Sequence, residues 1–339
     1  MTAPDPMALP APPGLLVFLL GLTLVLHWAC LGLLVATLWA RIGAEWGRRR
    51  DYDIEQLHRA SVLGISTTIT AGVAPLLFVQ VLYGKYIYSS SITIGYAWLA
   101  IVGYLLVGFY ALYLSRWRWD KVGGPSTGSR MYLILAILMV FAIGFTYSWN
   151  HLQSLSATPW SGAVAHPLAA RRLIGYGGAV LIASGVWAAW LGRMWRRDQL
   201  PPSGTRWALT AGGVLLLLWA RVSDYAPSGV GQYAKEILIF SPVLAILAGA
   251  ASLRRGVRSA IRWLATIAAL GGLVGLVLQR ESYRLHILGA DHNPVASGVH
   301  MQWGPFLMFA IALVVGLGVL VWMLIQVRRT ASGSHDAPA

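Results

Sequence analysis

Long runs of apolar residues dominate the chain, and short polar segments separate them. Most of the nine runs approach or exceed the roughly 20 residues that a helix needs to cross a bilayer, and the sixth is the shortest. The pattern predicts an all-α integral membrane protein, a bundle of nine transmembrane helices. The runs are residues 14–40, 61–84, 92–115, 131–151, 169–192, 206–221, 236–252, 259–280 and 303–327.

Basic residues gather in alternate segments between these runs. The first, third, fifth and seventh loops are rich in Arg and Lys, and Arg328 and Arg329 follow the last run. The second loop carries only Lys85, and residues 150–170 are uncharged. Because cytoplasmic loops carry the excess of Lys and Arg, this alternation predicts an N-terminus outside the membrane and a C-terminus in the cytoplasm.

Composition supports the membrane interpretation and excludes nucleic acid as a partner. The chain has a mean hydropathy of +0.63, with 57% hydrophobic and only 11% charged residues. Its net charge of +14 comes from the loop clusters, which are topology signals rather than a nucleic-acid surface. We expect a multi-pass protein of the bacterial inner (cytoplasmic) membrane. The domains expected are a Pro-rich N-terminal segment (1–13), a transmembrane helical domain (14–329) and a disordered tail (330–339).

A single cysteine, Cys30, lies inside the first apolar run. The sequence therefore has neither a disulfide framework nor a Cys-x-x-Cys-His motif for covalent heme attachment. Any heme in this chain would be held non-covalently, and any heme c would lie on a partner. The N-terminal segment has no basic region before the apolar run, so we expect that run to remain as a helix.

The segment from Ile65 to Ser91 is apolar enough to cross a membrane, yet it carries many polar and small residues. Gly72 and Pro75 interrupt it, and Gln80 and Tyr83 lie near its end. Unsatisfied polar groups are costly in hydrocarbon. The segment should therefore be buried in protein, either as a tightly packed helix with small contact residues or beside a cofactor.

Few ionisable residues lie at membrane depth, and these are the candidates for function. His27 lies near the middle of the first run, where an imidazole is either a hydrogen-bonded packing group or an axial ligand for heme iron. Arg280, Glu281 and Arg284 cluster at the end of the eighth run. The Glu281-x-x-Arg284 spacing puts both side chains on one helix face, where the arginine can hold the carboxylate or a propionate. Five histidines fall on the predicted outer side and are read mainly as loop residues: His151, His166, His286, His292 and His300.

Taken in order, these residues resemble subunit I of the cytochrome bd quinol oxidases, a nine-helix family with the same orientation. The resemblance implies that His27 is an axial heme ligand and that Glu281 lies opposite it or is a second iron ligand. It also implies that Arg284 or Arg280 pairs with the propionates, with Gln80 and Tyr83 next to the ligands. The matching positions are His27, Gly72-Val73-Ala74, Gly84, Trp119-Asp120-Lys121 and Glu281-x-x-Arg284.

The chain also departs from that family's pattern. Gln80 stands where the family has a carboxylate, and apolar or glycine residues around Ala100 and Gly108 replace its glutamates. A histidine near Ala170–Arg172 and a methionine near Ile237, the family's ligands for a second heme, are missing, and the quinol loop shrinks to Ser223–Ala234. The chain therefore lacks the residues that the family uses for proton delivery to oxygen and for quinol oxidation.

Three functions stay open on the sequence alone. The first is a membrane subunit of a respiratory electron-transfer complex that holds a b-type heme near the outer side and exchanges electrons with a c-type cytochrome. The second is a heme-free scaffold that anchors other membrane subunits of such a complex. The third is a quinone-handling membrane anchor, with His286 or His300 near the quinone head group.

Overall fold

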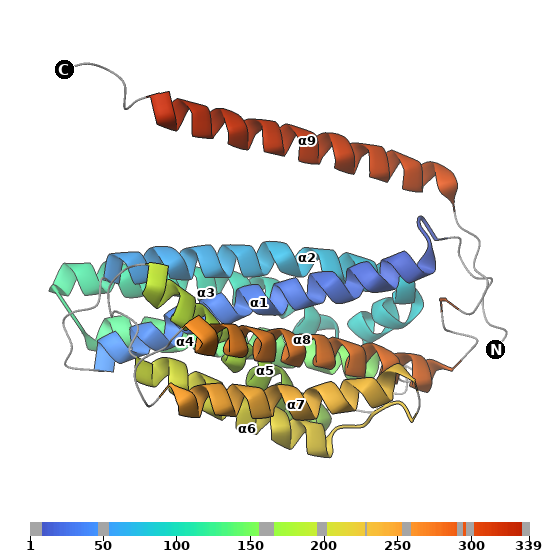
Figure 1. Cartoon of the computed structure of the whole chain (residues 1–339), viewed down its shortest axis with the longest axis horizontal. Coiled ribbons are helices and arrows are strands. Elements are labelled where there is room, and N and C mark those ends of the chain that lie inside the picture. Colours follow the sequence, from blue (N-terminus) through green and yellow to red (C-terminus); the bar gives the residue numbers. More distant parts are fainter. Residues whose placement is uncertain are drawn as a thin grey trace.

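The computed structural model describes residues 9–46, 54–155, 166–194, 202–227, 229–252, 259–289, 294–295 and 302–333. Within these residues the protein is all helical, with nine α-helices and no β-sheet (Figure 1). The helices are α1 Pro13–Trp46, α2 Ile54–Thr93, α3 Gly95–Val122, α4 Thr127–Gln153, α5 His166–Met194, α6 Pro202–Val222, α7 Val230–Ala251, α8 Ser259–Leu288 and α9 Trp303–Gly333.

Each apolar run of the sequence corresponds to one of these helices. Eight of the helices are long and apolar enough to cross a membrane, so the protein is an all-α, multi-pass membrane bundle. The exception is α6, which has 21 residues but carries Arg206 and Arg221 near its ends. It was also the shortest run in the sequence. The last helix, α9, continues to Gly333, and residues 334–339 of the expected tail lie outside the described part.

Helices α1 to α8 pack side by side, and helices that follow each other in the chain run in opposite directions (Figure 1). The most extensive contacts are those of α1 with α2, α5 with α6, α3 with α4 and α7 with α8, and α1 also packs on α5. Helix α9 lies apart from this bundle in Figure 1. Near its start, Phe306 packs with Leu9 and Leu16, and the Gln302 amide donates to the Leu9 carbonyl at 2.9 Å.

Small residues allow the central helices to approach closely. A Cβ on Gly178 of α5 would lie 2.7 Å from the backbone nitrogen of Leu216 and 3.0 Å from the carbonyl oxygen of Gly212, both on α6. Only glycine fits at such a backbone contact. Close backbone approach through small residues is how membrane helices gain packing energy without a hydrophobic driving force.

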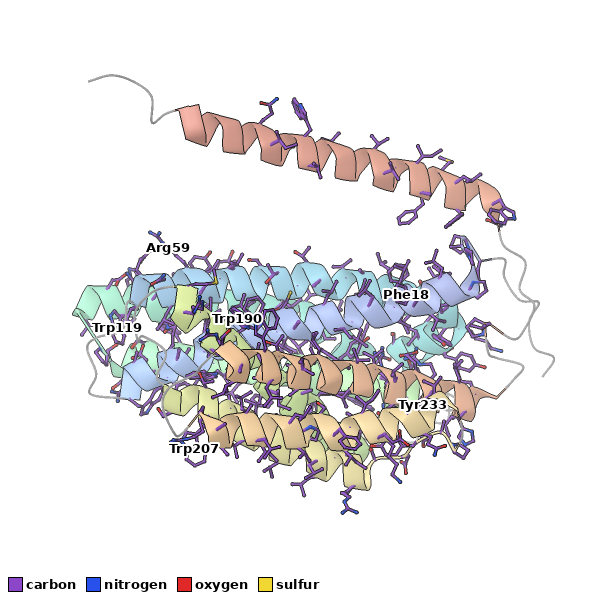
Figure 2. All side chains as sticks on the ribbon, in the orientation of Figure 1. Phe18, Arg59, Trp119, Trp190, Trp207 and Tyr233 are labelled. Atoms are coloured by element: carbon purple, nitrogen blue, oxygen red, sulfur yellow. The ribbon has the colours of Figure 1, made fainter. Side chains whose placement is uncertain are left out.

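The outside of the bundle is apolar, and aromatic residues lie towards both ends. Figure 2 shows Phe18 and Tyr233 towards one end and Trp119 and Trp207 towards the other. Phe18 is 63% exposed and Trp207 is 68% exposed. Exposed apolar surface with aromatic residues near its ends is what a lipid-facing surface with interfacial belts requires. We name the two ends after buried residues. The Glu281 end is where α1 begins and α8 ends, and the Arg41 end is opposite.

The Arg41 end is held together by a buried ion pair. The sequence placed Arg41 in the first loop, but α1 continues past it, and its side chain is fully buried. The Arg41 guanidinium lies 3.8 Å from the Glu45 carboxylate and donates from Nη2 to the Ser115 hydroxyl of α3 at 2.8 Å. Ser129, which forms the capping box of α4 with Ser126, donates to Glu45 Oε2 at 2.7 Å. These bonds tie α1 to α3 and α4.

Candidate functional site

His27 projects from the middle of α1 against α2. Its Nδ1 lies 2.9 Å from the carbonyl oxygen of Thr68. A Cβ on Gly72, one turn further along α2, would lie 2.9 Å from two ring atoms of His27, so this glycine makes room for the imidazole. Because a carbonyl oxygen can only accept, Nδ1 carries the ring proton, and Nε2 keeps the lone pair. Metal-ligating histidines are commonly held in the same way, with one ring N–H donating to a backbone carbonyl while the other nitrogen binds the metal.

A second polar group of residues occupies the Glu281 end. Arg284 Nη1 lies 3.1 Å from Glu281 Oε2, and the Arg284 guanidinium stacks over the Tyr83 ring at 4.5 Å from its centroid. Arg280 Nε lies 3.7 Å from Glu281 Oε1. All of these residues are buried, with Arg284 only 1% exposed. The structure therefore brings together four of the residues that the sequence proposed, Tyr83, Arg280, Glu281 and Arg284, on α2 and α8.

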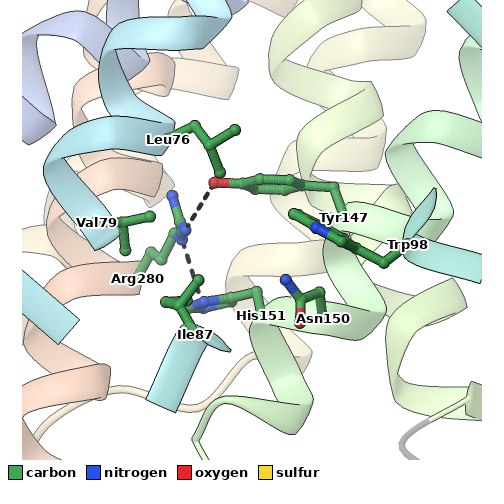
Figure 3. A pocket seen from close by; sticks show the side chains of 8 residues that line it. All are labelled: Leu76, Val79, Ile87, Trp98, Tyr147, Asn150, His151 and Arg280. Carbon is green, nitrogen blue, oxygen red and sulfur yellow. Dashed lines mark hydrogen bonds between the residues drawn. The ribbon is translucent and has the colours of Figure 1, made fainter. Parts of the chain in front are cut away.

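Two residues of α4 complete this cluster, and sequence reasoning missed them. His151 Nδ1 lies 2.9 Å from Arg284 Nη2, and His151 Nε2 lies 3.4 Å from Arg280 Nε. Tyr147, one turn earlier, accepts from Arg280 Nη2 at 3.4 Å (Figure 3). The sequence pattern assigns His151 to a loop, because the fourth apolar run ends there and the uncharged segment 150–170 begins. The available signal was the spacing of Tyr147 and His151, which places both on one face of the helix.

Arg280, Arg284, Glu281, His151, Tyr147 and Tyr83 are called the arginine cluster below. Both ring nitrogens of His151 face guanidinium groups, although a neutral imidazole has only one acceptor nitrogen. The shorter contact, with Arg284, makes Nδ1 the acceptor. Nε2 then carries the proton and faces the Arg280 Nε–H at 3.4 Å, so two donors confront each other. A third group that accepts from both would resolve this conflict.

The structure does not bring His27 level with Glu281. Gly21 of α1 faces Val277 of α8, where a Cβ on the glycine would lie 3.2 Å from Val277 Cγ1. His27 lies six residues beyond Gly21 towards the Arg41 end, and Glu281 lies four residues beyond Val277 towards the other end. At about 1.5 Å per residue the two side chains are separated by about 15 Å along the bundle. They do not reach one iron atom as opposite ligands in this arrangement.

The remaining sequence candidates do not join either group in the described structure. Gln80 is half-buried on α2, between the levels of Gly72 and Tyr83. His286 is exposed in the last turn of α8. His300, His292 and the side chain of His166 lie outside the described residues, so the quinone interpretation of His300 stays a prediction. Among the described residues there is no cluster of three His, Cys, Asp or Glu side chains that could hold a bare metal ion.

Comparison with known proteins gives no relative. No protein-family model, no curated protein and no solved structure matches this chain.

Proposed function

We propose that the chain is a nine-span subunit of a respiratory electron-transfer complex in the bacterial inner membrane, with a b-type heme held by His27. The N-terminus lies outside, and the Arg41 end faces the cytoplasm, because the basic loops lie at that end. The resemblance to subunit I of cytochrome bd points in the same direction, and the all-helical bundle is compatible with it.

The observation that carries the heme proposal is the hydrogen bond from His27 Nδ1 to the Thr68 carbonyl at 2.9 Å. This bond holds the imidazole in one tautomer and leaves Nε2 to bind iron. Gly72 has no Cβ, and a Cβ there would clash with the His27 ring in this position. The pairing thus provides, within two transmembrane helices, an oriented neutral ligand.

Of the two arginines, Arg280 is the nearer to a heme at His27, about 14 Å along the bundle, and Arg284 lies beyond it at about 20 Å. Arg284 Nε and Nη1 are buried and have no hydrogen-bond partner among the described residues, although Nη1 contacts the Glu281 carboxylate. Glu281 and Tyr83 orient this guanidinium rather than bind iron, since Glu281 is about 15 Å from the level of His27. Arg280 faces the Tyr147 hydroxyl and His151 Nε2, each at 3.4 Å, and its Nη1 has no hydrogen-bond partner among the described residues.

A b-type heme supplies reversible one-electron chemistry when bound. The chain itself supplies an oriented imidazole, and the arginine cluster supplies positive charge towards the Glu281 end. The short segment Ser223–Ala234 leaves no long quinol loop between α6 and α7. The electron partner in this proposal is therefore another protein, a c-type cytochrome that docks at the Glu281 end.

The decisive experiment is a dithionite-reduced minus oxidised spectrum, with a pyridine hemochrome assay, on the chain purified alone. We expect a b-type signal in the wild type that disappears in His27→Ala, because the only oriented imidazole in the two-helix site is removed. His286→Ala is the matched control, since this histidine is exposed, and it should keep the signal. Equal heme content in His27→Ala and the wild type would refute His27 as the ligand.

The alternative is a heme-free scaffold. One observation favours the scaffold: His27 and the arginine cluster already contact partners within the chain, so these contacts can serve helix packing alone. The same experiment separates the two proposals. A folded wild-type preparation without heme would leave a subunit that anchors partners, which then carry the redox groups.

A further inference from the structure

A small cavity opens beside the arginine cluster, between α2, α3, α4 and α8. Figure 3 shows its lining: apolar side chains from α2 on one side, and polar side chains that converge from α3, α4 and α8. Its volume is about 10 Å³, which is about the space that one buried water requires. The side chains with N–H or O–H donors are Trp98, Tyr147, Asn150, His151 and Arg280.

The charges around this cavity do not balance within the described residues. Arg280 and Arg284 are buried next to a single carboxylate, Glu281. With His151 neutral, these groups sum to an excess positive charge. Buried charge without a counter-charge is costly, so a complementary anion is expected.

Unsatisfied hydrogen-bond donors of Arg280 and His151 also indicate a bound anion. Arg280 lines the cavity, is 3% exposed, and its Nη1 has no hydrogen-bond partner among the described residues. Its Nε confronts the protonated Nε2 of His151 at 3.4 Å. An anion in the cavity would accept from both residues and remove the conflict between the two donors.

We propose that this cavity binds a single halide ion, chloride under physiological conditions. The lining offers donors and apolar contacts, and no acidic side chain lines it. The cavity holds about one water-sized group, so a chloride ion requires only a small expansion, whereas phosphate or sulfate would have to displace the lining side chains. The site goes beyond the proposed electron-transfer function and does not depend on a heme at His27.

The test is equilibrium dialysis of the purified full-length chain against radioactive chloride, in gluconate buffer of constant ionic strength. We expect one saturable chloride per chain, displaced by bromide. Arg280→Gln should abolish the site, and Tyr147→Phe, which keeps the ring and removes one donor, should weaken binding about tenfold or more. Arg221→Gln, an exposed arginine of α6, should leave binding unchanged.

Three outcomes would overturn the proposal: no saturable chloride in the wild type, unchanged affinity in Tyr147→Phe, or displacement by phosphate as effective as by bromide. If Arg280→Gln fails to fold, Tyr147→Phe still decides. The assay is repeated on heme-free His27→Ala protein. Chloride binding there supports the halide site even if the heme proposal fails, and its loss in a folded variant counts against the site.

Discussion

At the scale of single residues, the main feature is that charged side chains are buried in pairs. Arg41 and Glu45 are both fully enclosed, and Glu281 with its two arginines is nearly so. A buried ion pair adds little net stability compared with apolar residues, but removing one partner leaves a charge without compensation. Such pairs therefore act as restraints on which helices can be neighbours.

This reasoning predicts different costs for two ion pairs with the same spacing. Arg41→Met should lower the free energy of unfolding by about 3–5 kcal/mol, because it strands the Glu45 carboxylate in the bundle. Arg59→Met breaks the pair between Arg59 and Glu55, whose side chains are 77% and 48% exposed respectively. This loss should lower the free energy of unfolding by at most about 1 kcal/mol. Unfolding titrations in mixed micelles measure both.

The double variant Arg41→Met with Glu45→Gln is the control for this comparison. It removes both charges and should recover part of the lost stability. Equal costs for Arg41→Met and Arg59→Met would contradict the burial of the first pair.

At the scale of helices, α5 and α6 show how a helix of low hydropathy is held in a membrane bundle. Helix α6 alone is not apolar enough to count as a span. Nevertheless it packs along α5 and α7, and backbone-to-backbone contact at Gly178 and Gly212 joins it to α5. Packing, rather than hydropathy, keeps this helix in the bundle.

Adjacent glycines on α5 provide a test. Gly178→Ala puts a methyl group 2.7 Å from a backbone atom of α6, and it should destabilise the protein by about 1–3 kcal/mol through overpacking. Gly177→Ala meets nothing within 4 Å and should be neutral or slightly stabilising. The same unfolding titration measures both variants, and a similar loss in each would argue against the close approach of α5 and α6.

At the scale of the whole molecule, the two ends differ in charge and in the way they are closed. Basic residues such as Arg59 and Lys121 lie at the Arg41 end, while Lys85 belongs to α2 near the Glu281 end. In our proposal this asymmetry sets the orientation in the membrane. The proposed orientation places His27 within the membrane and the arginine cluster near the outer membrane surface.

Cysteine labelling tests this orientation. In a Cys30→Ser background, Lys85→Cys should react with a membrane-impermeant maleimide in intact cells, because exposed Lys85 is on the proposed outer side. Lys121→Cys, also exposed, should react only after permeabilisation. The opposite labelling pattern would reverse the orientation and place the arginine cluster on the cytoplasmic side.

Sequence alone predicted the elements well and the site only in part. Apolar runs predicted every helix because hydrophobic length is a local property of the chain. Glu281 and Arg284 were found because their spacing on one helix is also local. His151 and Arg41 were misplaced in loops, since an apolar run shows where hydrocarbon contact ends and not where a helix ends. Contacts such as that between His27 and Thr68 depend on helix packing, which no local pattern encodes.

Helix α2 is much longer than a membrane is thick. Its 40 residues measure about 60 Å at 1.5 Å per residue, against about 30 Å of hydrocarbon. The helix does not use this length as one straight rod, because its backbone is non-helical at Tyr83 (φ −130°, ψ 31°) and the helix bends there. Beyond the bend, Ile87 lines the same cavity as Leu76, and Ser90 donates to Asn150 of α4. A soluble protein that approaches from this side therefore meets the bent segment of α2 before it meets the cavity.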